Sequence, residues 1–176
     1  MTGNPHFMGY LPLKLNDMLS QQQTRFLDRA IELSALGMNT GQGGPFGCVV
    51  VKNGEVIGEG YNMVTSTNDP TAHAEVVAIR AACRHLKSFQ LDGCEIYTSC
   101  EPCPMCLGAI YWARPAKVYF ANTRKEAAAI QFDDDFIYGE ITAMIHERKI
   151  PFEHTPSGKA RKVFSDWVLL RDKKGY

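Results

Sequence analysis

Two short segments of the sequence carry residue types that bind transition metals: a His-Ala-Glu segment at 73–75 and a Pro-Cys-Pro-Met-Cys segment at 102–106. Cys103 and Cys106 are three residues apart, so on one helical turn both sulfur atoms face the same side and can take two corners of a tetrahedron around zinc. The positive end of a helix that begins there favours thiolate over thiol. His73, at the start of a neighbouring helix, can supply the third corner. Three protein ligands leave the fourth position for water, which is typical of a catalytic zinc site.

Glu75 adds a proton carrier to this group. It follows His73 by two residues, so on the first turn of the same helix its carboxylate can point at the fourth position without binding the metal. Zinc lowers the pKa of a bound water to about 7, and a carboxylate within reach can take the proton and pass it to a leaving group. These residues therefore predict the hydrolytic removal of an amine.

Simpler interpretations of the same residues remain open. A Cys-x-x-Cys pair also occurs in redox and structural sites, and a single histidine on a helix is often only hydrogen-bonded. Cys100 allows a closed Cys3His structural site, although it precedes Pro102 at a strand end and would have to turn back to reach the metal. That site would leave Glu75 without a function. The remaining cysteines lie in apolar patterns and are interpreted as small core residues: Cys48, Cys83 and Cys94.

The elements that position these residues follow from hydrophobic periodicity and turn residues. Asn53-Gly54 predicts a two-residue hairpin turn, Thr71 a helix N-cap, and Pro102 the first turn of a helix. In chain order, we expect a helix from Gln21 to the Gly-rich run 41–44, strands at 47–52 and 56–61, a helix from about Ala72, a strand at 94–99, a helix with its body at 105–113, a strand at 117–121 and a last helix around 163–170.

This order predicts one α/β domain with three layers, in which helices cover both faces of a mixed sheet. Residues 1–20 show no clear period and are interpreted as an N-terminal extension, and residues 21–176 as a single catalytic domain. The last helix is expected to dock through an apolar stripe and to carry the chain end with it. The stripe consists of Val163, Phe164, Trp167, Val168 and Leu170.

Composition excludes several classes of protein. The 176 residues fit one domain, and a core of that size needs no disulfides, so six cysteines require another explanation. Nineteen basic and nineteen acidic residues give a net charge of zero, which argues against a duplex DNA binder and a stable nucleic-acid partner. The longest apolar stretch, 105–113, is too short to span a membrane, and residues 1–20 lack a secretory apolar run. We therefore expect a protein of the reducing cytoplasm with no membrane partner.

The two metal-binding segments also carry a resemblance, because H-x-E followed by P-C-x-x-C is the motif of zinc-dependent nucleobase deaminases. The chain resembles the cytidine deaminase superfamily and, within it, the bacterial guanine deaminases, from about residue 24 to the last residue. The narrower evidence is the Phe-Asp-Asp segment at 132–134 and the terminal tyrosine. The motifs that carry the resemblance are Gly-Gly-Pro-Phe-Gly at 43–47, Asn-Asp-Pro-Thr-Ala-His-Ala-Glu at 68–75, Thr-Ser-Cys-Glu-Pro-Cys-Pro-Met-Cys at 98–106 and Gly-Ala-Ile-Tyr-Trp-Ala-Arg-Pro at 108–115.

The resemblance implies roles for further residues. It implies a sheet of five strands, one Zn²⁺ per chain held by His73, Cys103 and Cys106, and proton transfer by Glu75. The resemblance implies substrate contacts by Asn62, Phe46 and Ala74. Asn62 would hydrogen-bond the purine. Phe46 would stack on the purine, although a core aromatic is an equally good interpretation of this residue. Asp134 would be a second proton carrier near the exocyclic amine, although the acidic run 133–135 also suits a solvated turn. Tyr176 would enter the active site of the partner in a homodimer with a swapped C-terminal segment.

The expected reaction is the hydrolysis of guanine, a small-molecule purine base, to xanthine and ammonia. Guanosine, cytosine and tRNA adenosine deaminases share the zinc motifs and remain alternatives. A basic tail favours the tRNA enzymes, whereas the neutral net charge and the Phe-Asp-Asp segment argue against them. A structural zinc-binding module is the alternative that is not an enzyme.

Overall fold

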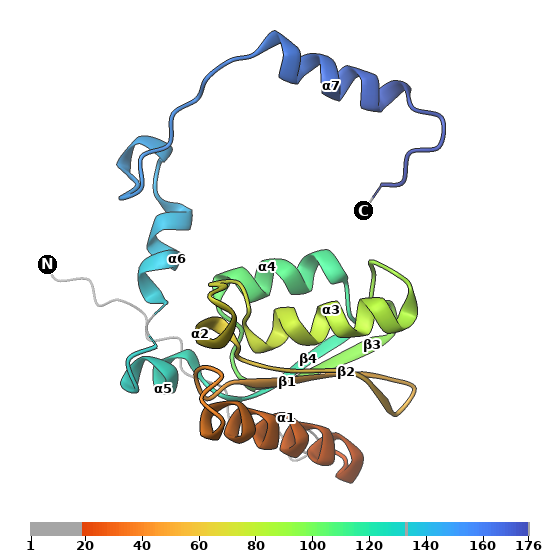
Figure 1. Ribbon diagram of the computed structural model, residues 1–176, viewed down its shortest axis with the longest axis vertical. Helices are drawn as coiled ribbons and strands as arrows, with labels where there is room; N and C mark the ends of the chain where they lie inside the picture. Colours follow the sequence, from red (N-terminus) through yellow and green to blue (C-terminus); the bar gives the residue numbers. More distant parts are fainter. Residues whose placement is uncertain (1–18, 133, 176) are drawn as a thin grey trace, which may run out of the picture.

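The computed structural model describes residues 19–132 and 134–175 and has three layers (Figure 1). A four-stranded sheet forms the middle layer, α1 covers one face, and α3 and α4 lie on the other face. The layered part contains α1 (Gln21–Asn39), β1 (Gly47–Lys52), β2 (Glu55–Tyr61), α2 (Val64–Thr67), α3 (Ala74–Leu86), β3 (Cys94–Cys100), α4 (Pro104–Ala113) and β4 (Lys117–Asn122). The expected α/β/α architecture is therefore confirmed.

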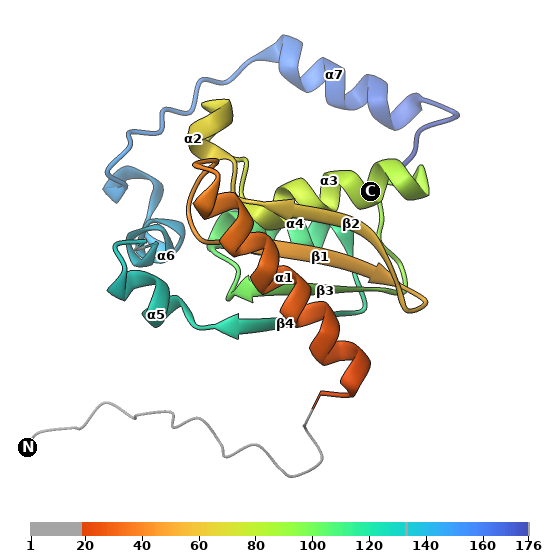
Figure 2. The same cartoon turned by 60° about the horizontal axis from the view of Figure 1, so that its bottom comes forward.

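The sheet has the strand order β2-β1-β3-β4 and is mixed, because β1 pairs antiparallel with β2 and β3, whereas β3 and β4 are parallel (Figure 2). The turn between β1 and β2 holds Asn53 and Gly54 at positive φ, as the sequence predicted for a two-residue hairpin. Within the described residues the sheet has four strands, where five were expected. The chain turns helical after β4 because Thr123 and Glu126 form a capping box that starts α5 (Arg124–Ala129).

The core lies on both faces of β1 and β3. Val49 and Val51 pack with Leu33 of α1 and with Tyr97, while Val50 packs on the α3 side with a separate buried cluster. This explains the continuous valine run of β1, since a central strand is buried on both faces. All four of these β1 and β3 side chains are nearly inaccessible to solvent, so the sheet forms a rigid base for the loops at its ends.

Residues beyond α5 lie outside the layered part. They form α6 (Asp135–Thr142), a short 3-10 helix (Ile145–Glu147) and α7 (Gly158–Leu169), and α7 is separated from the sheet and its covering helices in both ribbon views. The side chain of Phe164 is 77% exposed, and no residue of α7 is buried. The last helix thus exists as predicted, but within the described parts of this single chain its apolar stripe stays exposed. Among the described residues, no helix has the length and apolar character required to cross a membrane.

Candidate active site

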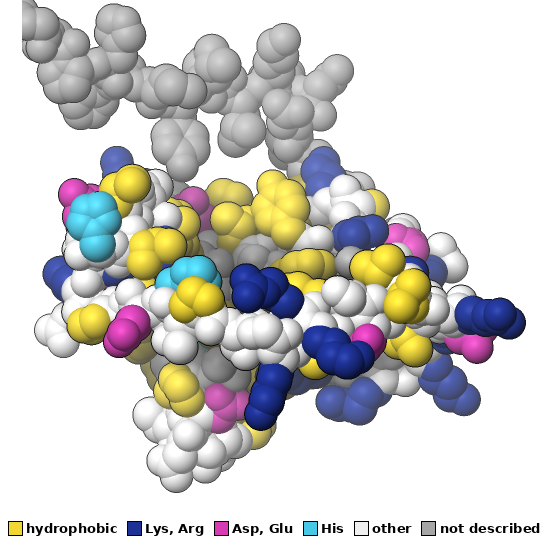
Figure 3. All heavy atoms as spheres, turned by 90° about the horizontal axis from the view of Figure 1, so that it is seen from above, with side chains coloured by type: hydrophobic (Ala, Val, Ile, Leu, Met, Phe, Trp, Pro, Cys, Tyr) yellow, Lys and Arg dark blue, Asp and Glu magenta, His cyan; other side chains and the backbone are white. Residues whose placement is uncertain are grey.

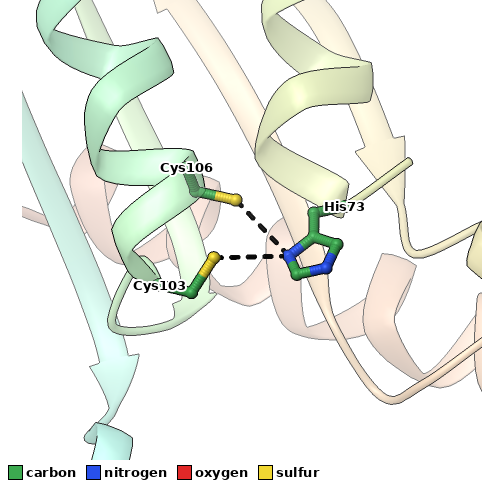
Figure 4. A group of neighbouring side chains, drawn as sticks. All are labelled: His73, Cys103 and Cys106. Carbon is green, nitrogen blue, oxygen red and sulfur yellow. Dashed lines mark hydrogen bonds between the residues drawn. The ribbon is translucent and has the colours of Figure 1, made fainter. Parts of the chain in front are cut away.

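The metal-binding segments occupy the N-termini of α3 and α4, which lie side by side on one face of the sheet (Figure 4). His73 is the N-cap residue of α3, one residue before the helix, and Cys103 is the N-cap residue of α4. The sequence placed both helix starts about two residues too early. Asp69 accepts hydrogen bonds from the backbone N–H and the hydroxyl of Thr71, which holds Thr71 in a turn, and Pro104 rather than Pro102 takes the first helical position.

His73, Cys103 and Cys106 converge, and their ligand atoms all lie within 4.8 Å of one another. Nδ1 of His73 lies 3.5 Å from the sulfur of Cys103 and 3.5 Å from that of Cys106, as Figure 4 shows. A tetrahedral zinc ion about 2.05 Å from nitrogen and about 2.3 Å from sulfur separates these two atom types by about 3.6 Å. The distances in the structure therefore fit a zinc ion held by these three side chains.

One of the two thiols already favours the form that binds metal, whereas the pKa of Cys106 is raised, mainly by its hydrogen bond with Cys103. A hydrogen bond with the Cys106 thiol, together with contact to His73, lowers the pKa of Cys103 to about 4 although burial opposes ionisation. The pKa of His73 is raised, mainly by its hydrogen bond with Cys103. One sulfur is therefore a thiolate at neutral pH, and thiolate is the form that binds metal ions.

Glu75 lies beside the ligands but is not one of them. It is 6% exposed; its Oε2 accepts a hydrogen bond of 3.4 Å from the Cys106 thiol and its Oε1 one of 3.4 Å from the Thr98 hydroxyl. Burial raises the pKa of the Glu75 carboxyl. A buried carboxyl with a raised pKa binds a proton more readily than a solvated one, so next to a metal site it can take up a proton and pass it on.

Cys100 is close to the site without joining the ligand group. Its thiol donates to the carbonyl oxygen of Thr123 at 3.8 Å, and burial raises its pKa to about 11. Among the described residues, the group whose geometry suits a metal contains three ligands, so the alternative of a closed Cys3His site is not supported. Cys48 and Cys94 are fully buried and Cys83 packs against the same core, as predicted for core cysteines.

A cavity of about 430 Å³ opens above His73, Cys103 and Glu75. This volume is in the range of small-molecule sites. Phe46 forms one wall, where its ring meets Phe132 edge to face at a centroid distance of 4.9 Å. Asn62 is only 5% exposed and lies on the cavity wall.

The remaining residues singled out by the sequence fall in different places. Asp134 is the N-cap residue of α6 and lines the cavity. Ala74 is fully buried at the start of α3 and does not line the cavity, so its side chain cannot contact a ligand there. Its backbone N–H is one of those at the helix start that have no partner within the helix. Tyr176 lies outside the described residues.

Three residues of the site were not found from the sequence. Phe132 meets Phe46 edge to face, and the Thr98 hydroxyl donates to Glu75. Arg124 lines the cavity, and its guanidinium lies 4.8 Å from the ring centroid of Tyr138. Phe132 was named only as part of a motif. The position of Thr98 at an inward-facing point near the end of a central strand is the signal that could have identified it.

Comparison with known proteins decides the family. The model for the cytidine and deoxycytidylate deaminase zinc-binding region matches residues 20–122. The chain belongs to this deaminase family. The family expected from H-x-E and P-C-x-x-C is thus confirmed, and the matched residues of this deaminase include all three candidate ligands and Glu75.

Individual relatives narrow the comparison. Guanine deaminase of Bacillus subtilis is 55% identical over 151 residues, which cover 86% of this deaminase and 97% of the relative. A crystal structure of that protein superposes with a TM-score of 0.85, covering 87% and 98% of the two chains. A tRNA-specific adenosine deaminase of Aquifex aeolicus is 34% identical, over 70% of this chain and 79% of the relative. The protein NE0047 in complex with 2,6-diaminopurine is 30% identical with a TM-score of 0.61, covering 66% and 64%.

Proposed function

We propose that this deaminase hydrolyses guanine to xanthine and ammonia. The observation that carries the proposal is the similarity to Bacillus subtilis guanine deaminase, which extends over 97% of that protein at 55% identity. The similarity to a tRNA-specific adenosine deaminase is lower in identity and covers less of the chain. A structure of a more distant relative with 2,6-diaminopurine supports a purine as the ligand of this fold.

His73, Cys103 and Cys106 would hold one zinc ion per chain, a proposal supported by the nitrogen–sulfur distances of 3.5 Å. When bound, the ion supplies Lewis-acid chemistry that makes water acidic enough to be a nucleophile near pH 7. The thiols have to stay reduced to bind a metal, which supports a reducing, cytoplasmic setting.

Glu75 would take one proton from the attacking water and deliver it to the exocyclic nitrogen of guanine. The water oxygen forms a bond to the carbon that carries the amine, and the carbon–nitrogen bond then breaks as ammonia leaves. Glu75 suits this role because burial raises its pKa and because the Thr98 hydroxyl holds its Oε1 in place. Asp134, on the cavity wall, would handle the second proton of the water near the exocyclic amine; that proton ends on the ring nitrogen beside the attacked carbon, so the products are xanthine and ammonia.

Phe46 and Asn62 would bind the purine ring. Phe46 offers an aromatic wall that is fixed by its contact with Phe132, and aromatic side chains stack on the flat face of any nucleobase. Asn62 offers a buried amide on the cavity wall. Ala74 would contribute through its backbone N–H.

We also propose that the active unit is a homodimer in which α7 docks on the partner and delivers Tyr176 to the partner's cavity. Val163, Phe164 and Trp167 expose large apolar surfaces, and exposed apolar patches of this kind mark protein contacts. Seen from the α7 side, hydrophobic and basic side chains are interspersed over the surface (Figure 3). Apolar Tyr111 and Trp112 of α4, which are 75% and 62% exposed, provide further surface for a second copy.

A panel of substrates tests the proposed reaction. Ammonia release is measured from guanine, guanosine, adenine, cytosine and a tRNA anticodon stem, with the purified zinc-loaded protein. We expect guanine to be turned over fastest. Faster release from the tRNA stem or from a nucleoside would replace guanine by that substrate, and release from none of the five would favour the zinc module without catalytic activity.

A further inference from the structure

The Asn62 carboxamide is held on one side only. Its Oδ1 accepts hydrogen bonds from the backbone N–H of Gly44 at 3.3 Å and from that of Val64 at 3.2 Å. Two backbone donors facing the same atom fix which end of the amide is oxygen, because a flipped amide would set its NH2 group against both N–H groups. Within the described residues, Nδ2 has no hydrogen-bond partner and is not sealed from solvent. The amide therefore presents a donor, and no acceptor, to the cavity.

Gly43 creates the space for this arrangement. A Cβ atom added there would lie 2.2 Å from Oδ1 of Asn62 and 2.6 Å from its backbone oxygen, both far inside van der Waals contact. The φ angle of Gly43 is not in the left-handed region, so the requirement for glycine is one of close approach. Any other residue at this position would push Asn62 out of place.

Gly44 and its neighbours make the arrangement rigid. A Cβ atom on Gly44 would lie 2.7 Å from the ring of Phe132 and 3.0 Å from the ring of Phe46. The loop that carries both glycines is fastened to the segment after Asn62, because the carbonyl oxygen of Gln42 accepts from the backbone N–H of Ser66 and from the hydroxyl of Thr65. The amide and the aromatic wall of the cavity are thus set by one backbone unit before a ligand enters.

We propose that Gly43 and Gly44 are positioning residues for Asn62, and that they make this site selective for purines which offer a hydrogen-bond acceptor to the Asn62 NH2 group. The inference deepens the proposed function and rests on it for the location of the base. It assigns no direct substrate contact to either glycine. Gly43 acts through the orientation of the amide alone, whereas Gly44 holds the amide through its N–H and leaves room for the rings of Phe46 and Phe132.

A double-mutant cycle tests the coupling between Gly43 and Asn62. We expect Gly43→Ala to raise KM for guanine about tenfold, the effect of losing about one hydrogen bond to the ligand. Asn62→Ala should have a similar effect, and because the amide is then already absent, the KM of the double variant should lie within about twofold of that of Asn62→Ala. The new Cβ still meets the backbone oxygen of residue 62 in the double variant, so its melting temperature should fall below that of Asn62→Ala. Losses that multiply in the double variant would overturn the proposal, because they would show that Gly43 acts independently of Asn62. Zinc content and melting temperature are measured for each variant.

A matched control separates this effect from adding a methyl group in general. Gly139→Ala makes the same change at an exposed position of α6 with no atom within 4 Å of the new Cβ, and it should leave KM unchanged. The cycle uses whichever base the wild-type protein turns over fastest. If that base is not guanine, the proposed function is contradicted, but the coupling between Gly43 and Asn62 can still be measured.

Asn62→Asp keeps the proposal testable if Gly43→Ala does not fold. The aspartate keeps an oxygen toward the two backbone N–H groups, which favour its ionised form, and replaces the NH2 donor by an acceptor. We expect KM measured at pH 8 to rise at least as much as with Asn62→Ala. An unchanged KM would show that no donor is needed at this position and would overturn the proposed selectivity.

Discussion

At the scale of single residues, the contacts of Glu75 separate proton transfer from metal binding. Both carboxylate oxygens are engaged, one by the hydroxyl of Thr98 and one by the thiol of Cys106, yet the carboxylate is not among the three ligand atoms that converge. Its side chain is buried and its pKa is raised by that burial. Replacing the Glu75 carboxylate by a group that cannot carry a proton should therefore leave the metal bound.

Glu75→Gln is expected to lower kcat by about 10³-fold, within the range that general acid–base catalysis contributes. Zinc content, measured by atomic emission, should stay at that of the wild type, because glutamine preserves the shape and the ligands are unchanged. Glu59→Gln is the matched control, since Glu59 is paired with Arg29 on the surface of the sheet. Near-normal turnover of Glu75→Gln with zinc bound would contradict the proton-transfer role.

Cys100 and Cys103 differ in burial and partners in a way that predicts different effects on the metal. Cys100→Ala should keep zinc, because its thiol donates to the carbonyl of Thr123 and stands outside the ligand group. Cys103→Ala should lose most of the zinc and the activity, because one of three protein ligands is removed. Zinc-to-protein ratios after exhaustive dialysis compare the two variants. Loss of zinc from Cys100→Ala would revive the closed four-ligand site.

The sequence predicted the residues whose relation is local and missed those whose relation depends on the fold. The ligands and Glu75 belong to motifs in which spacing along a helix start already determines geometry. Thr98 and Phe132 reach the site only because β3 pairs beside β1 and because α5 turns the chain back over the cavity. Nothing in the spacing of Phe46 and Phe132, which are far apart in the chain, indicates that their rings meet.

At the scale of elements, the close approach of α1 to the sheet depends on Gly47 at the start of β1. A Cβ atom added there would lie 2.1 Å from the carbonyl oxygen of Ala30 and 2.5 Å from the backbone nitrogen of Ser34. Both neighbours are helix backbone, which cannot move aside as a flexible side chain does. A Cβ atom added at Gly58 or Gly60 of β2 would likewise clash with the backbone of α3.

Gly47→Ala is therefore expected to destabilise the protein by about 2 kcal/mol, a usual cost of overpacking. For a chain of this size such a loss lowers the melting temperature by about 4 to 8 °C. Calorimetry of the zinc-loaded protein measures the shift. Gly108→Ala is the matched control: it lies within α4 with no atom within 4 Å of the new Cβ, and alanine should raise the melting temperature slightly. Equal melting temperatures of Gly47→Ala and wild type would contradict the packing argument.

The long elements were predictable from periodicity and the short ones were not. The predictions for α1 and β1 agree with the structure because each has a continuous apolar pattern with clear end residues, and the prediction for the body of α4 agrees as well, although its start was placed two residues too early. α2 and α5 are four and six residues long, too short to show a helical period. The N-cap of α3 was wrong by two residues because Asp69, through its two hydrogen bonds with Thr71, decides where the helix can begin.

At the scale of the whole molecule, α7 presents apolar surface that no other described part of the chain buries. Trp167 and Val168 are 46% and 66% exposed, and the net charge of the chain is zero, so no charge repulsion opposes association. A second copy would bury this helix, and the sequence prediction of a docking helix is consistent with that arrangement. The contribution of Tyr176 can then be separated from the contribution of α7.

Deletion of Tyr176 alone is expected to lower kcat/KM for guanine at least about tenfold, as the loss of one good contact to the bound base would. Dimer mass and zinc content should not change, because α7 and the ligands are intact. Deletion of residues 158–176 should in addition shift the protein from dimer to monomer, since it removes the exposed apolar helix. Light scattering gives the mass and ammonia release gives the rate.

A mixed dimer tests whether the tail enters the cavity of the partner. The Tyr176 deletion is mixed with an inactive Glu75→Gln chain. In a swapped mixed dimer, the intact tail of the Glu75→Gln chain enters the cavity of the truncated chain and should restore part of its activity. No recovery in verified mixed dimers would contradict delivery of the tail to the partner.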